Sequence, residues 1–382
     1  MSVRNDDDLK VAAKALQAGD GRRASALLKP IADAHPGHAQ IWMMLAEAHR
    51  IAGDHAGLEA AADRVISIEP RALRAYGWKG DCRVALGDAR GGASWYKEGL
   101  AQGARFSPLP QGLDAEMARQ RGALEEIESA FAAQLNDGLL AHGISPGGTS
   151  GRFAESIDLL NGTKSIQLQK PATYYFPGLP QRAFYEREAF DWVPRVEAST
   201  DIIREELIAA LANDDLFTPY LQVEPARPHR DFHGMTGNKD WSALHLIDNG
   251  IVSPTNQARF PKTLAAMELA PLCRIGVRAP TVMFSLLKGG ARIPPHHGAI
   301  NTRLICHLPL VVPGNGALRC GNYQRAWESG KLLIFDDSIE HEAWNDSSED
   351  RIILIFDIWR PELTNDERAA VTVLFDVIDS QA

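Results

Sequence analysis

Between Phe284 and Trp359 the chain alternates short apolar runs with polar, turn-forming sequences. The runs FSLL, RLICHLPL, KLLIF and RIILIFDIW are rich in β-branched and aromatic residues, and sequences such as GG, PP and PGNG stand between them. Apolar runs of this length, bounded by Gly, Pro and Asn, predict β-strands joined by tight turns. We therefore expect a compact antiparallel β-structure, a small barrel with some polar groups directed inward.

The first hundred residues show a helical pattern with an internal period. Gly-Asp pairs recur at 19–20, 53–54 and 87–88, a step of thirty-four residues, and a proline and an aromatic position keep the same step. Alanine-rich apolar spacing on either side predicts paired helices joined at these Gly-Asp turns. The period resembles the tetratricopeptide repeat, although Leu58 and Gly92 stand where that repeat prefers alanine. The resemblance implies a stacked helical solenoid, for which three repeats are about the minimum.

Two further segments set the expected domain boundaries. Helical apolar spacing from Leu113 to His142 predicts one long helix, and ISPGGTSG near residue 150 reads as a Gly/Ser/Pro-rich hinge. We therefore expect an α+β multidomain protein with tetratricopeptide-like helical repeats over residues 1–105, a capping helix and linker over 106–150, and a β-domain with flanking helices over 151–382. One flanking helix is predicted in STDIIREELIAALAN, with Ser199 or Thr200 as its cap.

Composition narrows the classes of function. A chain of 382 residues with 45% apolar residues is long enough for two globular domains. The net charge of -9 argues against a general nucleic-acid or anionic-membrane surface. The beginning of the chain lacks the apolar core of a signal peptide and no run reaches transmembrane length, so we expect a cytoplasmic protein without a membrane span. The four cysteines are widely spaced and predict neither a zinc knuckle nor a disulfide framework.

Two histidines in the β-rich stretch are candidates for metal binding. His296 and His341 stand near the ends of predicted strands, and only folding of the sheet can bring them together. Imidazole is a common ligand of iron, zinc and copper. His297 is adjacent to the first of them, but neighbouring strand residues point to opposite faces, so one of the two faces the metal. Arg351 opens the last apolar run, where an inward guanidinium needs a carboxylate partner.

The order of these residues resembles the catalytic domain of the aspartyl/asparaginyl β-hydroxylase family over roughly Tyr174 to Leu363. The family pattern of proline, histidine, any residue and glycine is matched by PHHG at 295–298. Its aspartate-aspartate-serine run before a second histidine is matched by FDDSIEHEAW. The resemblance implies a double-stranded β-helix (jelly-roll) fold and an Fe(II)- and 2-oxoglutarate-dependent dioxygenase that consumes O2. It places the iron ligands at His296 and His341.

The same resemblance assigns a 2-oxoglutarate site. It places the arginine that holds the far carboxylate at Arg351, with Ser285 assisting it, and a further histidine of the cosubstrate site at His307. Comparable family members carry another arginine where this chain has Ile305. Arg303 and His307 flank this position and are taken as further residues of the 2-oxoglutarate site, while the residues that bind the near carboxylate stay open.

Some alternatives stay open at the level of sequence. Non-haem oxygenases commonly use two histidines and one carboxylate, but Gly298 stands two residues after His296, and the resemblance implies that water takes the third position. A competing histidine-x-aspartate spacing occurs in HRD at 229–231, with His233 nearby, within a loop-like stretch. Arg351 also has nearby acids with which it could form an ordinary ion pair, namely Glu349, Asp350 and Asp357.

The resemblance implies hydroxylation of the β-carbon of aspartyl or asparaginyl residues in a peptide or protein. The helical repeats offer a concave surface that would recruit such a partner. Family membership does not fix the substrate, so a free amino acid or a lipid acyl chain is an alternative. A non-catalytic binding module built from repeats and a β-barrel is the alternative from a different class.

Overall fold

The computed structural model describes residues 3–145, 148, 150–212, 216–222 and 234–380, and the chain divides into two compact units between Lys164 and Ser165. The predicted boundary near residue 150 lies just before helix α8 (Gly151–Leu160), whereas the two units divide just after it. Each unit has its own hydrophobic core. We describe the two units separately.

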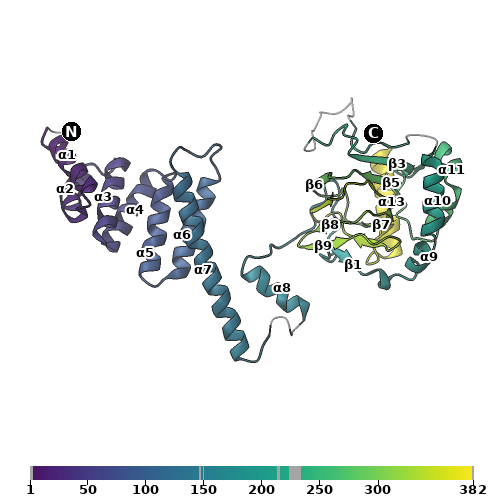
Figure 1. Ribbon diagram of the computed structural model, residues 1–382, viewed down its shortest axis with the longest axis horizontal. Coiled ribbons are helices and arrows are strands. Elements are labelled where there is room, and N and C mark those ends of the chain that lie inside the picture. Colours follow the sequence, from purple (N-terminus) through teal and green to yellow (C-terminus); the bar gives the residue numbers. More distant parts are fainter. Residues whose placement is uncertain (1–2, 146–147, 149, 213–215, 223–233, 381–382) are drawn as a thin grey trace. The chain divides into compact units, whose positions relative to one another are not determined.

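The first unit is built from helices that follow one another in antiparallel pairs (Figure 1). They are α1 (Val3–Gln17), α2 (Gly21–Ala34), α3 (Ala39–Ala52), α4 (His55–Ile68), α5 (Leu73–Ala85), α6 (Ala89–Gly103), α7 (Asp114–Ala141) and α8. Helix α7 confirms the long helix predicted over residues 113–142. The helical-repeat architecture expected from the thirty-four-residue period is therefore present.

The Gly-Asp pairs explain how one sequence motif joins successive helices. Gly53 has a φ of 70° and ends α3 in the left-handed conformation, which glycine adopts without steric penalty. Asp54 then caps α4, because its carboxylate accepts the Gly57 N–H at 3.0 Å. The same arrangement recurs at Asp20 before α2 and at Asp88 before α6. Each pair thus stops one helix and starts the next.

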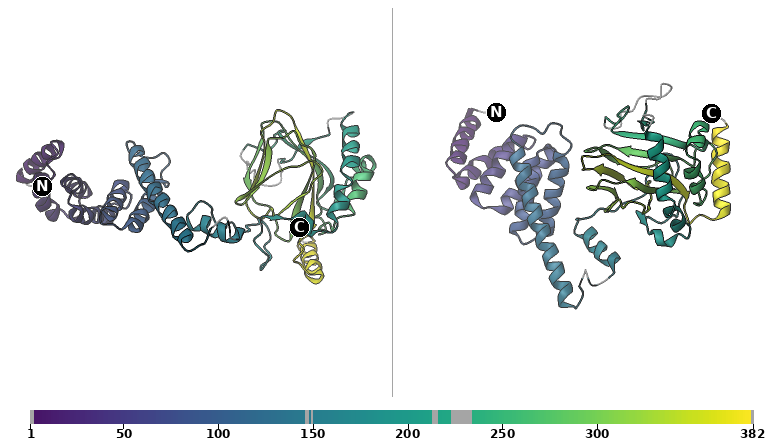
Figure 2. Two further views of the ribbon diagram at one scale, coloured as in Figure 1. Left: turned by 60° about the horizontal axis from the view of Figure 1, so that its bottom comes forward. Right: turned by 45° about the vertical axis from the view of Figure 1, so that its right-hand side comes forward.

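The second unit contains two antiparallel sheets (Figure 2). The larger sheet has the order β1-β10-β7-β12-β5-β3-β2, with β4 paired to β3, and the smaller sheet has the order β6-β11-β8-β9. The strands of the larger sheet are β1 (Phe184–Tyr185), β2 (Thr218–Pro219), β3 (Trp241–Asp248), β4 (Ile251–Val252), β5 (Val282–Leu287), β7 (Arg303–Val311), β10 (Leu333–Phe335) and β12 (Arg351–Trp359). Those of the smaller sheet are β6 (Arg292–His296), β8 (Gly316–Cys320), β9 (Tyr323–Ala326) and β11 (His341–Asn345).

This pair of sheets is the jelly roll that the resemblance implied. One apolar cluster, including Trp241, Ile293 and Phe335, draws on both sheets. A second cluster joins the larger sheet to the helices α9 (Val193–Glu197), α10 (Thr200–Leu211) and α12 (Pro261–Met267). The described part of this unit also contains the α-helices α11 (Pro254–Arg259) and α13 (Asn365–Asp379) and a 3-10 helix, η2 (Arg187–Ala189). The larger sheet is therefore buried on both faces, which explains the continuous apolar sequence of β12.

Helix α10 confirms the predicted flanking helix but not its cap. Ser199 occupies the N-cap position, yet its hydroxyl donates to the Arg195 carbonyl at 3.2 Å and accepts no N–H from the first turn. The Thr200 hydroxyl donates to the Glu197 carbonyl at 2.6 Å. Both hydroxyls are engaged by the preceding helix α9, so the predicted capping by Ser199 or Thr200 is wrong.

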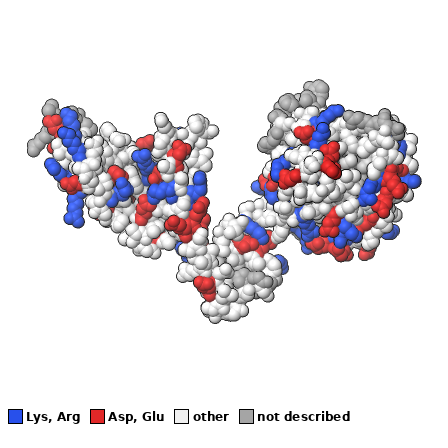
Figure 3. Space-filling model, viewed as in Figure 1, with Lys and Arg blue, Asp and Glu red and all other residues white. Residues whose placement is uncertain are grey.

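Charged side chains of both signs are interspersed on the face shown in Figure 3. Many of them pair locally, as Lys29 does with Asp33 at 2.5 Å and Arg204 with Asp201 at 2.6 Å. Across the part of the chain that the structure describes, no helix combines the length and apolar character needed to cross a bilayer.

Candidate active site

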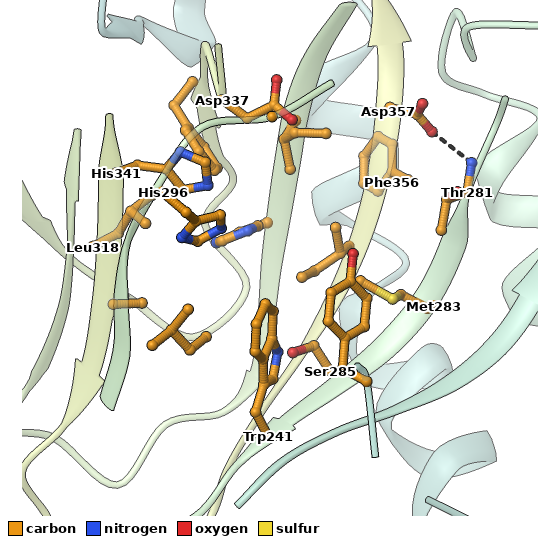
Figure 4. A pocket seen from close by; sticks show the side chains of 18 of the residues that line it. Trp241, Thr281, Met283, Ser285, His296, Leu318, Asp337, His341, Phe356 and Asp357 are labelled. Atoms are coloured by element: carbon orange, nitrogen blue, oxygen red, sulfur yellow. Dashed lines mark hydrogen bonds between the residues drawn. The ribbon is translucent and has the colours of Figure 1, made fainter. Parts of the chain in front are cut away.

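A cavity of about 390 Å³ lies between the two sheets of the second unit (Figure 4). Strand pairing brings its two central histidines together. His296 ends β6, His341 begins β11, and the two are direct partners in the ladder. Their ring centroids lie 4.0 Å apart. His296 and His341 are forty-five positions apart in the sequence, and this one antiparallel pairing brings them together, as any metal site shared by the two requires.

Both rings are oriented by the backbone. His296 Nδ1 lies 2.8 Å from the Pro294 carbonyl oxygen, and His341 Nδ1 lies 3.1 Å from the Ile339 carbonyl oxygen. A carbonyl only accepts, so Nδ1 carries the proton in both rings and Nε2 carries the lone pair. Burial lowers the pKa of His296, and burial with the neighbouring His296 holds the pKa of His341 well below its ordinary value. Neutral imidazoles held in this way are suited to bind a metal.

Arg351 supplies a buried positive charge on the opposite, larger sheet. Its side chain is 2% exposed, its Nη2 donates to Ser285 Oγ at 3.3 Å, and its guanidinium lies 4.7 Å from the Trp327 ring centroid. No carboxylate among the described residues pairs with it, so the ion pairs considered with Glu349, Asp350 and Asp357 do not form. Burial lowers its pKa to about 9. A buried guanidinium without a carboxylate is costly and creates a binding site for an anion.

His307 lies beside this arginine on β7. Trp327 Nε1 donates to His307 Nδ1 at 3.3 Å, which leaves the proton of the neutral ring on Nε2. Burial, followed by the charge of Arg351, holds the pKa of His307 well below its ordinary value. The predicted residues Ser285, His307 and Arg351 therefore all line one cavity with the two central histidines.

Arg303 lies in the same cavity but in a different electrostatic setting. Its Nη1 donates to Asp357 Oδ2 at 2.8 Å, and its Nη2 lies 3.6 Å from Asp337 Oδ2. Burial opposes its charge, but Asp357 and Asp337 outweigh this effect and raise its pKa. Two carboxylates thus compensate Arg303, whereas none of the described residues supplies one to Arg351. The predicted contact of Arg303 with 2-oxoglutarate remains a prediction, and Ile305 lines the cavity between Arg303 and His307.

Asp337 lines the cavity, although in the sequence it stood out only as part of a motif and not as a site residue. Burial raises its pKa to about 7 in spite of Arg303. Its carboxylate fills the space beside Gly298, where a Cβ atom would overlap it. The described residues contain no cluster of three or more His, Cys, Asp or Glu placed to hold a metal. The donor set is two neutral imidazoles with an acid nearby, which suits a divalent metal such as Fe(II).

Other expectations have mixed outcomes. The competing HRD sequence at 229–231 and His233 lie outside the described residues. Trp241 packs in the core between the sheets and also lines the cavity, with its ring 6.1 Å from that of His296. Asp357 was considered as a partner of Arg351 but pairs with Arg303, and Trp327 was missed as the neighbour of Arg351. Their only sequence signal was alternation along predicted strands, which does not tell which side chains meet.

The second unit has two facing sheets, one carrying a pair of histidines and the other a buried guanidinium. This arrangement defines a double-stranded β-helix domain with a polar interior site. Residues 197–361 match the sequence profile of the family described as aspartyl/asparaginyl beta-hydroxylase. The C-terminal half of the chain is therefore a domain of this family.

Individual relatives agree with this assignment. The chain is 33% identical over 206 residues to the aspartyl/asparaginyl beta-hydroxylase of Mus musculus, a match covering 52% of this chain and 28% of that protein. It is 31% identical over 180 residues to an ornithine lipid ester-linked acyl 2-hydroxylase of Rhizobium tropici, covering 46% of this chain and 60% of that protein. The chain thus spans little more than a quarter of the mouse relative's length.

A solved structure similar to the helical unit is the TPR domain of Sgt2 from Aspergillus fumigatus. The identity is 18% and the TM-score 0.29, and the match covers 34% of this chain and 80% of that one.

Proposed function

We propose that the second unit is an Fe(II)- and 2-oxoglutarate-dependent dioxygenase that hydroxylates its substrate. His296 and His341 would hold the iron through Nε2, with their Nδ1 protons fixed by backbone carbonyls. The observation that carries the proposal is Arg351, a buried guanidinium that has no carboxylate partner within the described residues and lines the same cavity as the histidines. A dicarboxylate that reaches from the metal to this guanidinium would give the metal an oxygen ligand and the guanidinium a negatively charged partner.

The residues around the cavity have separate tasks in this proposal. Bound iron would supply the activation of O2. Arg351, with the Ser285 hydroxyl, holds the far carboxylate of 2-oxoglutarate by charge-assisted hydrogen bonds. His307 offers an Nε2 proton beside it, and Arg303 and Asp337 line the same cavity. Apolar neighbours such as Ile293 and Leu318 restrict water, which strengthens these polar contacts.

For the substrate we propose aspartyl or asparaginyl residues in a peptide or protein, in a cytoplasmic setting. The support is the family match and the mouse relative, whose name states this activity. The helical unit supports a macromolecular target, because stacked helix pairs present extended surfaces to polypeptides.

A lipid acyl chain is a second candidate substrate. Ile305 places an aliphatic side chain in the cavity wall where comparable family members carry an arginine, and Ile293, Leu318 and Ala343 add apolar surface. The Rhizobium tropici relative is named for hydroxylation of such a chain. An acyl chain needs this kind of lining, whereas an aspartyl carboxylate needs a cation.

The test is turnover of 2-oxoglutarate by purified protein with Fe(II) and O2. We expect succinate to form, with faster formation in the presence of the true substrate. Mass spectrometry of candidate peptides and acyl lipids would then identify the molecule that gains one oxygen atom. Absence of both succinate formation and 2-oxoglutarate binding would refute the proposal and favour a non-catalytic module.

A further inference from the structure

The segment Ser165–Leu179, named the strap here, contacts the two loops next to the candidate metal ligands, namely the loop after His296 and the loop before His341, which we call the histidine loops. It contains no helix or strand and precedes the region that matches the family, residues 197–361. Its side chains alternate in an unusual way, because Ile166 and Leu168 are exposed whereas Gln169 is 6% exposed. Polar contacts of this buried glutamine therefore help to hold the strap in place, together with the packing of Tyr174 and Phe176 against an apolar cluster.

The strap is hydrogen-bonded through its backbone to both histidine loops. Lys170 N donates to the Ser338 carbonyl at 2.7 Å, three residues before His341. Ala172 N donates to the Gly298 carbonyl at 2.9 Å, two residues after His296. Thr173 and Tyr174 extend this second contact by donating to the Ala299 carbonyl at 2.8 and 3.1 Å. One short segment thus connects the end of β6 with the beginning of β11.

Gln169 links the same two loops through its side chain. Its Nε2 donates to Asp336 Oδ2 at 2.7 Å, and its Oε1 accepts from Asn301 Nδ2 at 2.9 Å. Both partners are fully buried, and the backbone N–H of Gln169 donates to Gln181 Oε1 at 2.6 Å. Arg360 reinforces the network by donating to Asp336 Oδ2 at 2.7 Å. Without the Gln169 side chain, Asp336 and Asn301 would each lose a hydrogen bond in a buried setting.

The network continues to the carbonyl that orients His341. Asp336 Oδ1 accepts the Ser338 N–H at 3.0 Å, and the Ile339 N–H donates to the Asp336 carbonyl at 3.2 Å. Ile339 in turn presents its carbonyl to His341 Nδ1 at 3.1 Å. The position of Asp336 therefore fixes the turn that sets the direction of this imidazole.

We infer that Gln169 is a positioning residue for the two histidines and that the strap belongs to the support of the metal site. The inference rests on the proposed function, because it assumes that His296 and His341 bind one metal ion. Gln169 acts through Asp336 and Asn301 and does not itself reach the metal.

The test is titration of the full-length protein with Co(II), whose visible absorption reports ligand geometry. We expect Gln169→Leu to raise the Co(II) dissociation constant roughly 10- to 100-fold, the range for partners that orient metal ligands. The absorption bands should also change shape, because the imidazoles are held less well. The isosteric variant Gln169→Glu keeps the acceptor for Asn301 and sets a carboxylate against Asp336, so it should weaken Co(II) binding even if Gln169→Leu fails to fold.

Two controls separate positioning from general stability. Gln167→Leu alters the same strap at a side chain that donates to Ser165 Oγ at 2.7 Å and contacts neither histidine loop through a hydrogen bond. Tyr185→Phe removes hydrogen bonds to Arg360 and Glu362, each 2.7 Å, but none to Asp336 or Asn301, through which Gln169 acts. It should lower the melting temperature but leave Co(II) affinity and spectrum unchanged.

Co(II) affinities of Gln169→Leu and Gln169→Glu that match those of Tyr185→Phe would overturn the inference. If the unaltered protein bound no Co(II), the proposed function itself would fail, and the inference with it. The inference is supported if Co(II) binding is weakened and the absorption bands shift in both Gln169 variants but not in the controls.

Discussion

The carboxylate of Asp337 occupies the space into which a side chain on Gly298 would extend. A Cβ atom at residue 298 would overlap Asp337 Oδ2, and the Gly298 N–H donates to the Asp337 carbonyl oxygen at 2.6 Å. The position two residues after His296 is thus closed to any larger residue. The acid nearest this position comes from the loop before His341 instead of from the loop after His296.

Gly298→Ala should therefore destabilise the second unit by about 1–3 kcal/mol, the usual cost of overpacking. Urea unfolding of the two proteins measures the difference. Gly122→Ala is the matched control, because a Cβ at this position in α7 meets nothing within 4 Å and should be neutral or stabilising. Adding Asp337→Gly to Gly298→Ala should recover part of the loss, and strictly additive effects would contradict the overlap.

Arg351→Met should weaken 2-oxoglutarate binding by about 3–5 kcal/mol, because the ligand carboxylate would lose its buried partner. The Michaelis constant for 2-oxoglutarate measures this loss. Without ligand the same variant should be at least as stable as the unaltered protein, since no carboxylate in the described residues pairs with Arg351.

The matched control for this variant is Arg325→Met. Arg325 forms an exposed ion pair with Glu186 at 2.5 Å, and such pairs contribute only about 0–1 kcal/mol. Arg325→Met should therefore leave the Michaelis constant for 2-oxoglutarate unchanged. An unchanged constant in Arg351→Met as well would show that Arg351 does not hold the cosubstrate.

His341→Ala should abolish metal binding and nearly all succinate formation while the fold persists, because one remaining imidazole does not hold the ion. Metal content after dialysis and succinate yield are the two measurements. His142→Ala, an exposed change in the helical unit, is the control for loss of a histidine. Normal turnover in His341→Ala would remove the metal assignment.

The stability of the metal-free protein should fall as pH rises through about 7. The pKa of Asp337 is raised to about 7 in the fold from an ordinary value of 3.8, so the folded state binds the proton more tightly. This contribution is fully present below about pH 4 and is lost as the pH passes 7, with a slope of at most about 1.4 kcal/mol per pH unit. Unfolding free energies from pH 5 to 8 should show a flatter profile for Asp337→Asn. Parallel profiles would contradict the raised pKa.

A fragment of residues 165–382 should fold and retain metal and 2-oxoglutarate binding, because it contains every candidate site residue and the strap. Circular dichroism verifies folding first. If the helical unit recruits the substrate, the fragment should hydroxylate a protein target poorly while consuming 2-oxoglutarate at a basal rate. An unchanged Michaelis constant for the protein target would exclude recruitment.

Local patterns in the sequence carried much of this structure. The Gly-Asp pairs predicted the helix junctions, because a left-handed glycine and a capping aspartate act within a few residues. Helix α7 and the central strands followed from the period of their apolar residues. The capping role given to Ser199 was wrong because its hydroxyl bonds to the preceding helix, a contact that propensity does not contain.

The sequence by itself determined which residues were candidates, since His296, His341, Ser285, His307 and Arg351 were singled out by their order along the chain. Only the tertiary structure decided how they are paired. Strand register sets the two imidazoles side by side, and packing of the sheets gives Arg303 two carboxylates but gives Arg351 none from the described part of the chain. Register and packing are set by contacts between residues far apart in sequence. The chemical role of each buried charge therefore depends on neighbours that no local pattern specifies.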